Sequence, residues 1–359
     1  MNKKPAFKAT RLTSTVFQLT EYSDIYSEYP FIYLKLLPEV IVLIDSGCGG
    51  KSTDPEVNLT SLREFIETVP IEDNDGKPFN GDGPEKREYI VICTHCHYDH
   101  ILGLEQFTED SPIYASSHSP SFLSPKNLPH NSLCQRLGIQ TPTYTPTLID
   151  HLSPILFHPP NQHQADQNQP KASSKSPSIN TSIQILHTPG HTPDSLAIWD
   201  KSEQMLYVGD TLYAHSPIIF PPEGNLTHWF RSIDLLISVC IDHTTTATSP
   251  TQTSIQTPAP TQTQTPRLNA GHSSSLRPAL SILSRAKSFL KDVVSGLEPI
   301  QDKITVPLYP AIKLIHQSLT KRTAHAVLSI NFVSFIYSNK QNQCKTVVQK
   351  KYKTQQSEK

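Results

Sequence analysis

The chain has 359 residues and a formal net charge of −1, with 36% hydrophobic and 18% charged residues. This length is enough for one large domain or two ordinary ones. The near-zero charge gives no electrostatic reason to expect nucleic acid or an anionic membrane as the main partner. The 31 prolines are many for a compact fold and indicate polar insertions.

The N-terminus and the cysteines indicate an intracellular chain. The first residues, Met-Asn-Lys-Lys-Pro, lack the apolar segment of a secretory signal. The longest apolar stretch, residues 326–337, falls short of the roughly 20 residues that a membrane span needs. Six scattered cysteines do not form the pattern of a disulfide framework, and we interpret Cys96 as a packing residue. We expect a soluble cytoplasmic protein whose oligomeric state the sequence leaves open.

The sequence of the first third of the chain predicts strands followed by a helix. β-Branched and aromatic residues predict strands over residues 12–20 and 31–37. The continuous apolar run at 40–44 predicts a strand that is covered on both faces. Helical spacing of apolar residues then predicts a helix over 60–69, with Thr60 as its N-cap.

A second strand and helix follow a polar loop at residues 70–88. Residues 89–93 are apolar and predict another buried strand. A cluster of polar residues comes directly after it, and residues 101–107 predict the start of a helix. Strands and helices that alternate in this way predict an α/β core.

Two low-complexity segments interrupt the second half of the chain. Residues 158–180 are rich in Gln, Pro, Ser and Lys, and residues 244–266 in Thr, Gln, Pro and Ser. Such segments cannot bury enough apolar area to offset their ordering entropy, so we expect disordered insertions. Strands are predicted between the two insertions over residues 183–187, 195–199 and 205–208.

The last predicted element is an amphipathic helix over residues 276–297, with Pro278 in its first turn. Its apolar stripe is formed by Leu280, Leu283, Ala286, Leu290, Val293 and Leu297. We therefore expect one domain over residues 1–300 that contains both insertions. Residues 301–359 form a C-terminal extension to which the sequence assigns no fold.

The segment after the strand at 89–93 carries the strongest chemical signal. Within six residues it holds three imidazoles and a carboxylate, from His95, His97, Asp99 and His100. It lies past the C-terminal end of a buried strand, where α/β folds place ligand sites. Burying these groups without a cation is costly, and imidazole with carboxylate suits Zn²⁺, Fe or Mn. His95 and His97 can bind one metal, and Asp99 and His100 a second.

The run from Thr94 to His100 resembles the HxHxDH signature of the metallo-β-lactamase superfamily. Four further residues match the family's motifs in order: Asp45 in Ile-Asp-Ser-Gly, His191 in Thr-Pro-Gly-His, Asp210 in Val-Gly-Asp-Thr and His272 in Asn-Ala-Gly-His. The resemblance covers roughly residues 12–297.

The resemblance implies an αββα four-layer sandwich with a site for two metal ions. It implies two Zn²⁺ per chain, with Fe or Mn as alternatives. Asp45 corresponds to a residue that usually lies behind the ligands, and Asp210 to the carboxylate that bridges the metals. The implied ligands are His95, His97, Asp99, His100, His191, Asp210 and His272. His272 is the weakest match because an insertion precedes its strand.

Two cations about 3.5–4 Å apart make hydroxide available near neutral pH, so a hydrolase needs no serine or cysteine nucleophile. We expect a small-molecule substrate with a carbonyl ester-type bond, a thioester or lactone, as in the family's stand-alone lactonases and acyl-CoA thioesterases. The predicted catalytic residues are Asp99 and Tyr213; a similar tyrosine in such members can hydrogen-bond the carbonyl. Residues 217–222, with Trp229 and Phe230, either form an apolar wall at the site or cap the core.

Three alternatives stay open. A glyoxalase-II-type or persulfide dioxygenase-type enzyme would share the HxHxDH motif, but no clear basic cluster for glutathione follows the later motifs. A nucleic-acid-processing hydrolase would share the ligands, but the net charge argues against it. A degenerate, non-catalytic protein conflicts with the intact ligand set.

Overall fold

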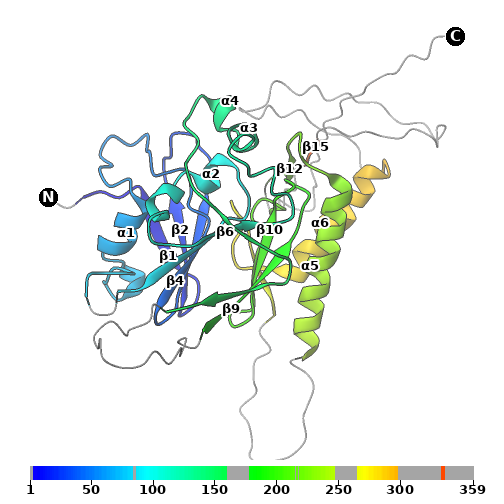
Figure 1. The fold of residues 1–359 in the computed structure, drawn as a ribbon. Helices are drawn as coiled ribbons and strands as arrows, with labels where there is room; N and C mark the ends of the chain where they lie inside the picture. Colours follow the sequence, from blue (N-terminus) through cyan, green and yellow to red (C-terminus); the bar gives the residue numbers. More distant parts are fainter. Residues whose placement is uncertain are drawn as a thin grey trace, which may run out of the picture. The chain divides into compact units, whose positions relative to one another are not determined.

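The structure is a computed structural model that describes residues 3–83, 86–159, 178–214, 216, 218–246 and 265–297, and the backbone of Val333–Phe335. Strands and helices alternate along these residues, which confirms the predicted α/β class (Figure 1). The chain divides into two compact units. Unit 1 comprises Met1–His187 with Ile198–Glu203, and unit 2 comprises Thr188–Ala197 with Gln204–Lys359.

Unit 1 contains a seven-stranded sheet whose strands follow the chain order from β1 to β7. Its first four strands pair antiparallel, and β4 to β7 pair parallel. Because parallel strands end at the same edge, the loops that follow β4 and β5 meet there. The strands are β1 (Phe7–Arg11), β2 (Val16–Glu21), β3 (Phe31–Leu36), β4 (Val40–Ile44), β5 (Glu88–Ile92), β6 (Ile113–Ser116) and β7 (Thr147–Ile149).

The strand predicted over residues 12–20 is confirmed only from residue 16 on, because β2 starts at Val16. The chain turns between β1 and β2, where the backbone N–H groups of Leu12 and Thr13 both donate to the Val16 carbonyl. The Thr13 hydroxyl accepts from the N–H groups of Thr15 and Val16. A threonine that bonds its own backbone in this way favours a turn over a ladder, and strand propensity alone does not detect it.

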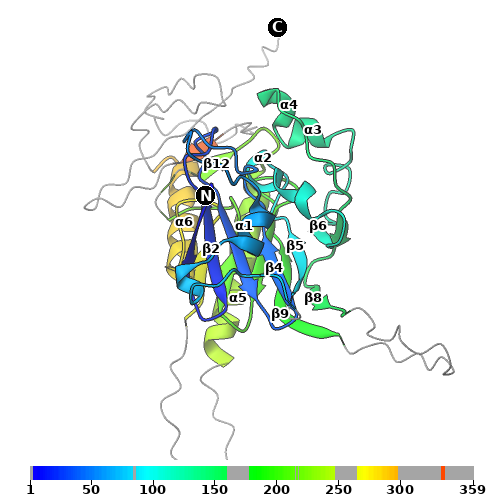
Figure 2. The same cartoon turned by 90° about the vertical axis from the view of Figure 1, so that its left-hand side faces the viewer.

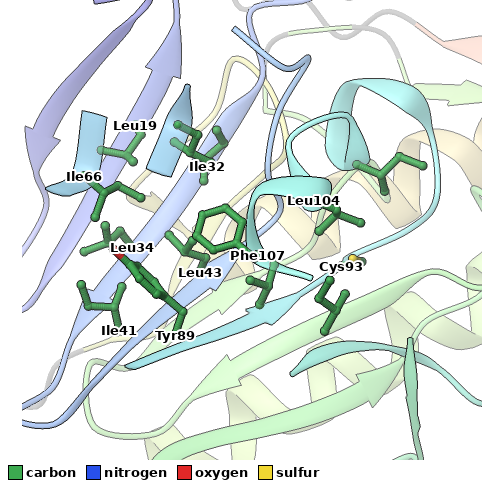
Figure 3. Packing of buried hydrophobic residues seen from close by; sticks show 14 of the residues in the cluster. Leu19, Ile32, Leu34, Ile41, Leu43, Ile66, Tyr89, Cys93, Leu104 and Phe107 are labelled. Atoms are coloured by element: carbon green, nitrogen blue, oxygen red, sulfur yellow. The ribbon is translucent and has the colours of Figure 1, made fainter. Parts of the chain in front are cut away.

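Helix α1 (Leu62–Thr68) packs on one face of this sheet (Figure 2). Its N-cap is Ser61, not the predicted Thr60: the Ser61 hydroxyl accepts from the N–H of Glu64 at 3.1 Å. Leu62, Phe65 and Ile66 are buried in a cluster with Leu19, Ile32, Leu34, Ile41, Leu43, Tyr89, Cys93, Leu104 and Phe107 (Figure 3). Cys96 belongs to the same cluster.

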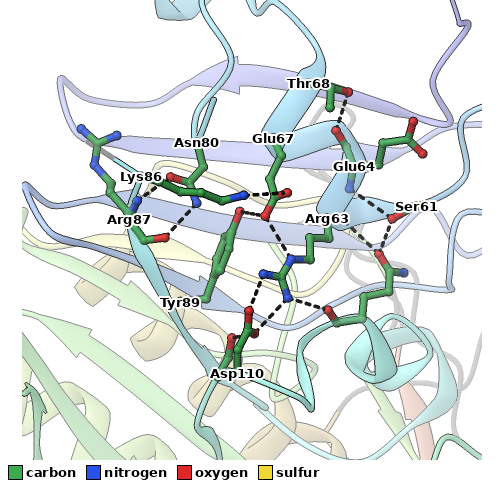
Figure 4. Close-up of polar contacts among 12 residues, drawn as sticks. Ser61, Arg63, Glu64, Glu67, Thr68, Asn80, Lys86, Arg87, Tyr89 and Asp110 are labelled. Carbon is green, nitrogen blue, oxygen red and sulfur yellow. Dashed lines mark hydrogen bonds and ion pairs between the residues drawn. The ribbon is translucent and has the colours of Figure 1, made fainter. Parts of the chain in front are cut away.

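Arg63 connects α1 to the segment that follows the histidine-rich loop (Figure 4). Its guanidinium donates to the Gln106 carbonyl at 3.0 Å and to both carboxylate oxygens of Asp110. It also pairs with Glu67, which accepts from the Tyr89 hydroxyl at 3.1 Å. A planar guanidinium can satisfy several acceptors at once, so this residue fixes α1 against residues 106–110.

The helix predicted to start at Ile101 starts earlier and is short. α2 covers Tyr98–Ile101, so Asp99 and His100 lie within it, and a 3₁₀ turn, η2 (Leu104–Phe107), follows. Gly103 separates them, and a Cβ there would lie 2.4 Å from the Ser46 carbonyl oxygen. The loop after β4 therefore approaches the chain at Gly103 too closely for a side chain at that position. Other short elements are η1 (Glu72–Asn74), α3 (Leu128–Asn131) and α4 (Cys134–Leu137).

A second sheet has the strand order β14-β13-β11-β10-β9-β8. Its strands are β8 (Pro154–Phe157), β9 (Ile179–His187), β10 (Leu196–Asp200), β11 (Met205–Tyr207), β13 (Arg267–Asn269) and β14 (Arg277–Pro278). β8 and β9 pair antiparallel, β11 and β13 pair parallel. In unit 2, β12 (Ile218–Phe220) pairs with β15 (Val333–Phe335).

Two long helices of unit 2 lie side by side, α5 (Leu226–Thr246) and α6 (Ala279–Val294) (Figures 1 and 2). An ion pair between Lys287 and Asp234 joins them. α6 is shorter than predicted because β14 takes up residues 277–278, and the predicted stripe is partly wrong. Leu280 and Leu297 are exposed, and the buried face is formed instead by Ala279, Ile282, Leu283, Phe289 and Leu290.

The expected insertions are shorter than predicted where the structure describes their ends. β9 starts at Ile179, and α5 continues to Thr246. Residues 160–177, 247–264 and most of the predicted C-terminal extension lie outside the described residues. Every helix of the described part is too short or too polar to span a lipid bilayer.

Candidate metal centre

Unit 1 supplies one group of donors from the loop after β5 and from the short helix α2 that follows it. The Nε2 atom of His95 lies 3.0 Å from the Nδ1 atom of His97, and the Nε2 atom of His100 lies 3.3 Å from a carboxylate oxygen of Asp99. All four residues are buried. With metal–ligand bonds of 2.0–2.1 Å, adjacent donors of a tetrahedral site lie about 3.3 Å apart. The two pairs therefore have the spacing of ligands on a shared cation.

Asp45 fixes this loop through contacts with Thr94 and His100. One of its oxygens accepts from the N–H of Thr94 at 2.7 Å, and the other contacts the Thr94 hydroxyl and the Nδ1 atom of His100, each at 2.8 Å. A hydrogen bond from Nδ1 directs the Nε2 lone pair of His100 toward Asp99. The backbone of Asp45 is left-handed, with φ of +64°. Asp tolerates this conformation better than most residues, and it marks a constrained position.

Unit 2 supplies the second group of donors. One oxygen of Asp210 lies 3.9 Å from the Nε2 atom of His191, and its other oxygen lies 3.7 Å from the Nε2 atom of His272. The Nδ1 atom of His191 lies 2.8 Å from the carbonyl oxygen of Ile219, to which it donates. That bond leaves the Nε2 of His191 as the ligating nitrogen. The carboxylate of Asp210 thus faces one histidine with each oxygen.

Strand register explains why Asp210 and His272 meet. β11 and β13 are parallel with Tyr207 opposite Asn269, so Asp210 and His272 each follow their strand at the same offset. The N–H of Gly271 donates to the carbonyl of Gly209, which ties the two turns together. His272, the weakest sequence match, therefore lies beside Asp210 as the motif order predicts.

A tight contact fixes the turn that carries His191. A Cβ on Gly190 would lie 2.6–2.8 Å from backbone and side-chain atoms of Trp229, and the backbone there has φ of +157°. The indole N–H of Trp229 donates to the Thr211 carbonyl at 2.7 Å. Trp229 is fully buried, so in this part of unit 2 it is a core residue that braces the turns.

Tyr213 lies next to a proposed ligand. Its ring centroid is 6.0 Å from that of His272, and the two rings are close to perpendicular at 75°. The side chain is 7% exposed, so its surroundings are mainly protein. The structure therefore brings three predicted ligands and Tyr213 together in unit 2, and the other four ligands together in unit 1.

Two partners of the ligands were not identified from the sequence. Thr94 contacts Asp45 and the Nδ1 atom of His95, the latter at 3.1 Å, and its only sequence signal is its place beside the motif. The carbonyl of Ile219 orients His191, and a backbone acceptor has no signature in the residue type. Imidazoles with fixed tautomers and carboxylates form a donor set that fits Zn²⁺, Fe or Mn.

Sequence comparisons show which known proteins the chain is similar to. A sequence profile of the metallo-beta-lactamase superfamily matches residues 39–295. The provisionally named transcription factor avaE of Aspergillus versicolor is 33% identical over 304 residues, which are 84% of this chain and 80% of avaE. Acyl-coenzyme A thioesterase MBLAC2 of Homo sapiens is 22% identical over 213 residues, 58% of this chain and 67% of that protein.

Solved structures support the fold. Metallo-beta-lactamase family protein TTHA1429 from Thermus thermophilus has a TM-score of 0.50 and 15% identity, over 80% of this chain and 83% of TTHA1429. The predicted sandwich of the metallo-β-lactamase type is thereby confirmed. Since the profile match covers well over half of the sequence, the chain belongs to the metallo-beta-lactamase superfamily, whose members are generally metal-dependent hydrolases.

Proposed function

We propose that the seven predicted ligands bind two divalent cations, Zn²⁺ first and Fe or Mn as alternatives, and that the protein hydrolyses a thioester or lactone. The observation that carries the proposal is the donor spacing of 3.0 and 3.3 Å in the loop after β5 and in α2, where Asp45 already orients His100. Buried, preoriented imidazoles are costly to maintain without a cation.

Metal ions bound by these residues would supply Lewis acidity and a nucleophile derived from water near neutral pH. Other groups of the chain orient the metal ligands and the substrate. Asp45 holds one tautomer of His100, and the Ile219 carbonyl holds one tautomer of His191. We infer that Tyr213, whose ring lies beside that of His272, donates a hydrogen bond to the substrate carbonyl and stabilises the charge that develops on it.

The choice of a thioester or lactone rests on two arguments. The MBLAC2 proteins among the relatives are named as acyl-coenzyme A thioesterases. Hydrolysis of an activated carbonyl also needs no nucleophilic side chain once hydroxide is available. A cytoplasmic location, expected from the sequence, stays a prediction that cell fractionation would test.

The test is a hydrolysis screen with protein depleted of metal and reloaded with Zn²⁺, Mn²⁺ or Fe²⁺. Acyl-CoA thioesters, lactones and a phosphodiester are the substrates, and Asp210→Ala is the blank. We expect metal-dependent turnover of thioesters or lactones that the blank lacks. Turnover of the phosphodiester alone, or oxygen uptake with a persulfide in the iron form, would replace this proposal by one of the alternatives.

The name of the Aspergillus relative raises a second candidate, binding to DNA. The net charge of −1 provides little attraction for a polyanion. We expect no shift of a random-sequence DNA pool at 0.15 M salt in an electrophoretic assay. A specific shift that survives competitor DNA would establish this second function.

A further inference from the structure

Two of the proposed ligands in unit 1 lie on a helix of a single turn. α2 covers only Tyr98–Ile101, and it carries Asp99 and His100. A helix this short is not stable by itself, because one turn fixes several backbone dihedrals for very few hydrogen bonds. Contacts outside α2 must therefore determine its orientation, and with it the position of both side chains.

One side of α2 is held by the segment that follows β4. The Nδ1 atom of His100 contacts Asp45 at 2.8 Å. The His100 carbonyl accepts from the N–H of Ser46 at 2.8 Å and from the Ser46 hydroxyl at 3.0 Å. Successive residues of an α-helix are rotated by about 100°, so the side chain of Tyr98 leaves α2 on nearly the opposite face from His100. A contact on that face keeps the turn from tilting.

The hydroxyl of Tyr98 makes this second contact. It donates to Oε1 of Glu28 at 2.5 Å, and the Tyr98 ring packs edge-on against Tyr26, with 5.2 Å between centroids. Tyr98 is 2% exposed, and Glu28 is half-buried. A hydrogen bond to a carboxylate is stronger than one between neutral groups. The side chain of Tyr98 therefore connects α2 firmly to the loop that carries Glu28.

The loop between β2 and β3 holds Glu28 in place. The Asp24 carboxylate accepts from the N–H of Glu28 at 3.2 Å and from the N–H of Tyr29 at 2.8 Å. Ser27 and Tyr29, on either side of Glu28, have left-handed backbones with φ of +61° and +51°. Such conformations persist only where surrounding contacts enforce them. Glu28 is thus fixed before it binds the Tyr98 hydroxyl.

We propose that Glu28, acting through the Tyr98 hydroxyl, is a positioning residue for the metal ion assigned to Asp99 and His100. This inference rests on the proposed metal centre. The bond between Glu28 and Tyr98 keeps the donor atoms of Asp99 and His100 at the 3.3 Å spacing that a shared cation requires. The other metal ion is bound by residues outside α2, so its affinity should not depend on this bond.

The test is a calorimetric titration of metal-depleted Tyr98→Phe with Zn²⁺. This variant loses the hydroxyl and keeps the ring contact with Tyr26. We expect two equivalents of Zn²⁺ to bind, with the affinity for one reduced about 10–100-fold and the affinity for the other unchanged. Unchanged affinity for both equivalents, or an equal loss for both, would overturn the proposal.

Tyr89→Phe is the matched control. It also removes a hydrogen bond from a buried tyrosine to a glutamate, in this case Glu67 of α1 (Figure 4). Its effect on stability should be similar, and it should keep both affinities for Zn²⁺. A selective loss of one equivalent in Tyr98→Phe alone therefore separates positioning of the ligands from a general loss of packing.

A conservative variant of Glu28 distinguishes its hydrogen bond from its charge. The amide oxygen of Glu28→Gln can still accept from the Tyr98 hydroxyl, so this variant should bind Zn²⁺ like the parent protein. Glu28→Leu removes the acceptor and should behave like Tyr98→Phe. If Glu28→Gln loses as much affinity as Glu28→Leu, the charge of Glu28 acts on the metal ion directly and the proposal is wrong.

Hydrogen exchange of the metal-depleted protein separates this proposal from the proposed function. The N–H of Leu102 donates to the Tyr98 carbonyl at 3.1 Å, so its exchange reports the opening of α2. We expect this exchange to be about 2–10-fold faster in Tyr98→Phe, and unchanged in Tyr89→Phe. Faster exchange in a protein that binds no metal would remove the proposed function alone. Exchange like that of the parent protein would overturn the positioning role, even in a protein that binds Zn²⁺.

Discussion

Asp45 illustrates how one carboxylate sets the geometry of the loop after β5. It contacts the backbone and side chain of Thr94 and the ring of His100, although it is not itself a proposed ligand. Replacing Asp45 by Asn keeps a residue that tolerates the left-handed backbone and removes the charge. We expect Asp45→Asn to weaken metal binding by about 10–100-fold.

Competition with a chromophoric chelator measures that affinity, and Asp82→Asn is the control because the Asp82 side chain is fully exposed. An affinity equal to that of the parent protein would mean that Asp45 does not position His100 for a metal ion.

Tyr213 gives a second prediction at the scale of one residue. Removal of its hydroxyl in Tyr213→Phe keeps the ring contact with His272. We expect kcat to fall by about 10²–10³-fold, the usual effect of losing one donor to a developing oxyanion. Steady-state kinetics on a thioester measures the change, with metal content checked by mass spectrometry. Unchanged turnover at full metal content would assign Tyr213 to packing.

Glu21 lies under the glycine-rich turn that follows β4. Its carboxylate accepts from the N–H of Gly50 at 3.1 Å, and a Cβ on Gly47 would lie 2.1 Å from its other oxygen. Burial raises the pKa of Glu21 to about 8, against the opposing effect of backbone N–H groups. The folded protein therefore holds a proton on Glu21 at pH values where the unfolded chain, with an ordinary pKa of 4.5, has lost it.

The direction of the pH effect follows from linkage. The stabilising contribution of protonated Glu21 is complete below pH 4.5, falls as the pH rises from 4.5 to 8, and is lost above 8. The loss has an upper bound of roughly 5 kcal/mol. Relative to Glu21→Gln, the parent protein should therefore be least stable above pH 8. Urea unfolding of both proteins between pH 5 and 9 measures this, and a difference independent of pH would contradict it.

At the scale of secondary structure, a buried ion pair joins β3 and β10 within unit 1. The ammonium of Lys35 lies 2.6 Å from a carboxylate oxygen of Asp200 and also donates to the Thr181 carbonyl and the Ser202 hydroxyl. Lys35 is 4% exposed and Asp200 is fully buried. Lys35→Met leaves a buried charge without its counter-ion, and we expect it to cost about 3–5 kcal/mol of unfolding free energy.

The double variant Lys35→Met/Asp200→Asn should recover much of that loss. The new amide is neutral, and its oxygen can still accept from the N–H groups of Ser202 and Glu203, as Asp200 does. Urea unfolding of both single variants and the double variant gives the coupling. Lys4→Met, which breaks exposed ion pairs with Asp54 and Glu56, is the control and should have a far smaller effect.

Two buried strands were predicted correctly from the pattern of apolar residues alone. The apolar run at residues 40–44 and the strand at 89–93 agree with β4 and β5 to within one residue, since strands buried on both faces are short continuous runs rich in Val and Ile. The stripe of α6 was partly wrong because two adjacent faces of that helix are apolar. Which one is buried depends on what packs against it, as the exposure of Leu280 shows.

For the whole molecule, metal ions should act as stabilising ligands. An ion that binds the folded chain in hundredfold excess over its dissociation constant adds about 2.7 kcal/mol to the unfolding free energy. We expect Zn²⁺ to raise the melting temperature by several degrees and a chelator to reverse the change, as differential scanning calorimetry would show. Asp210→Ala should lose most of this response. A melting temperature unaffected by metal and chelator would contradict the proposed centre.

The sequence by itself determined the superfamily, the α/β class and the candidate ligands, because these depend on residue types at fixed spacing. His95, His97, Asp99 and His100 are close in sequence, so local geometry suffices to group them. Only the tertiary structure decided that Asp210 faces two histidines, because this depends on the register of β11 with β13. It alone also revealed the carbonyl of Ile219 behind His191 and the buried Glu21, since backbone acceptors and burial have no pattern in the sequence.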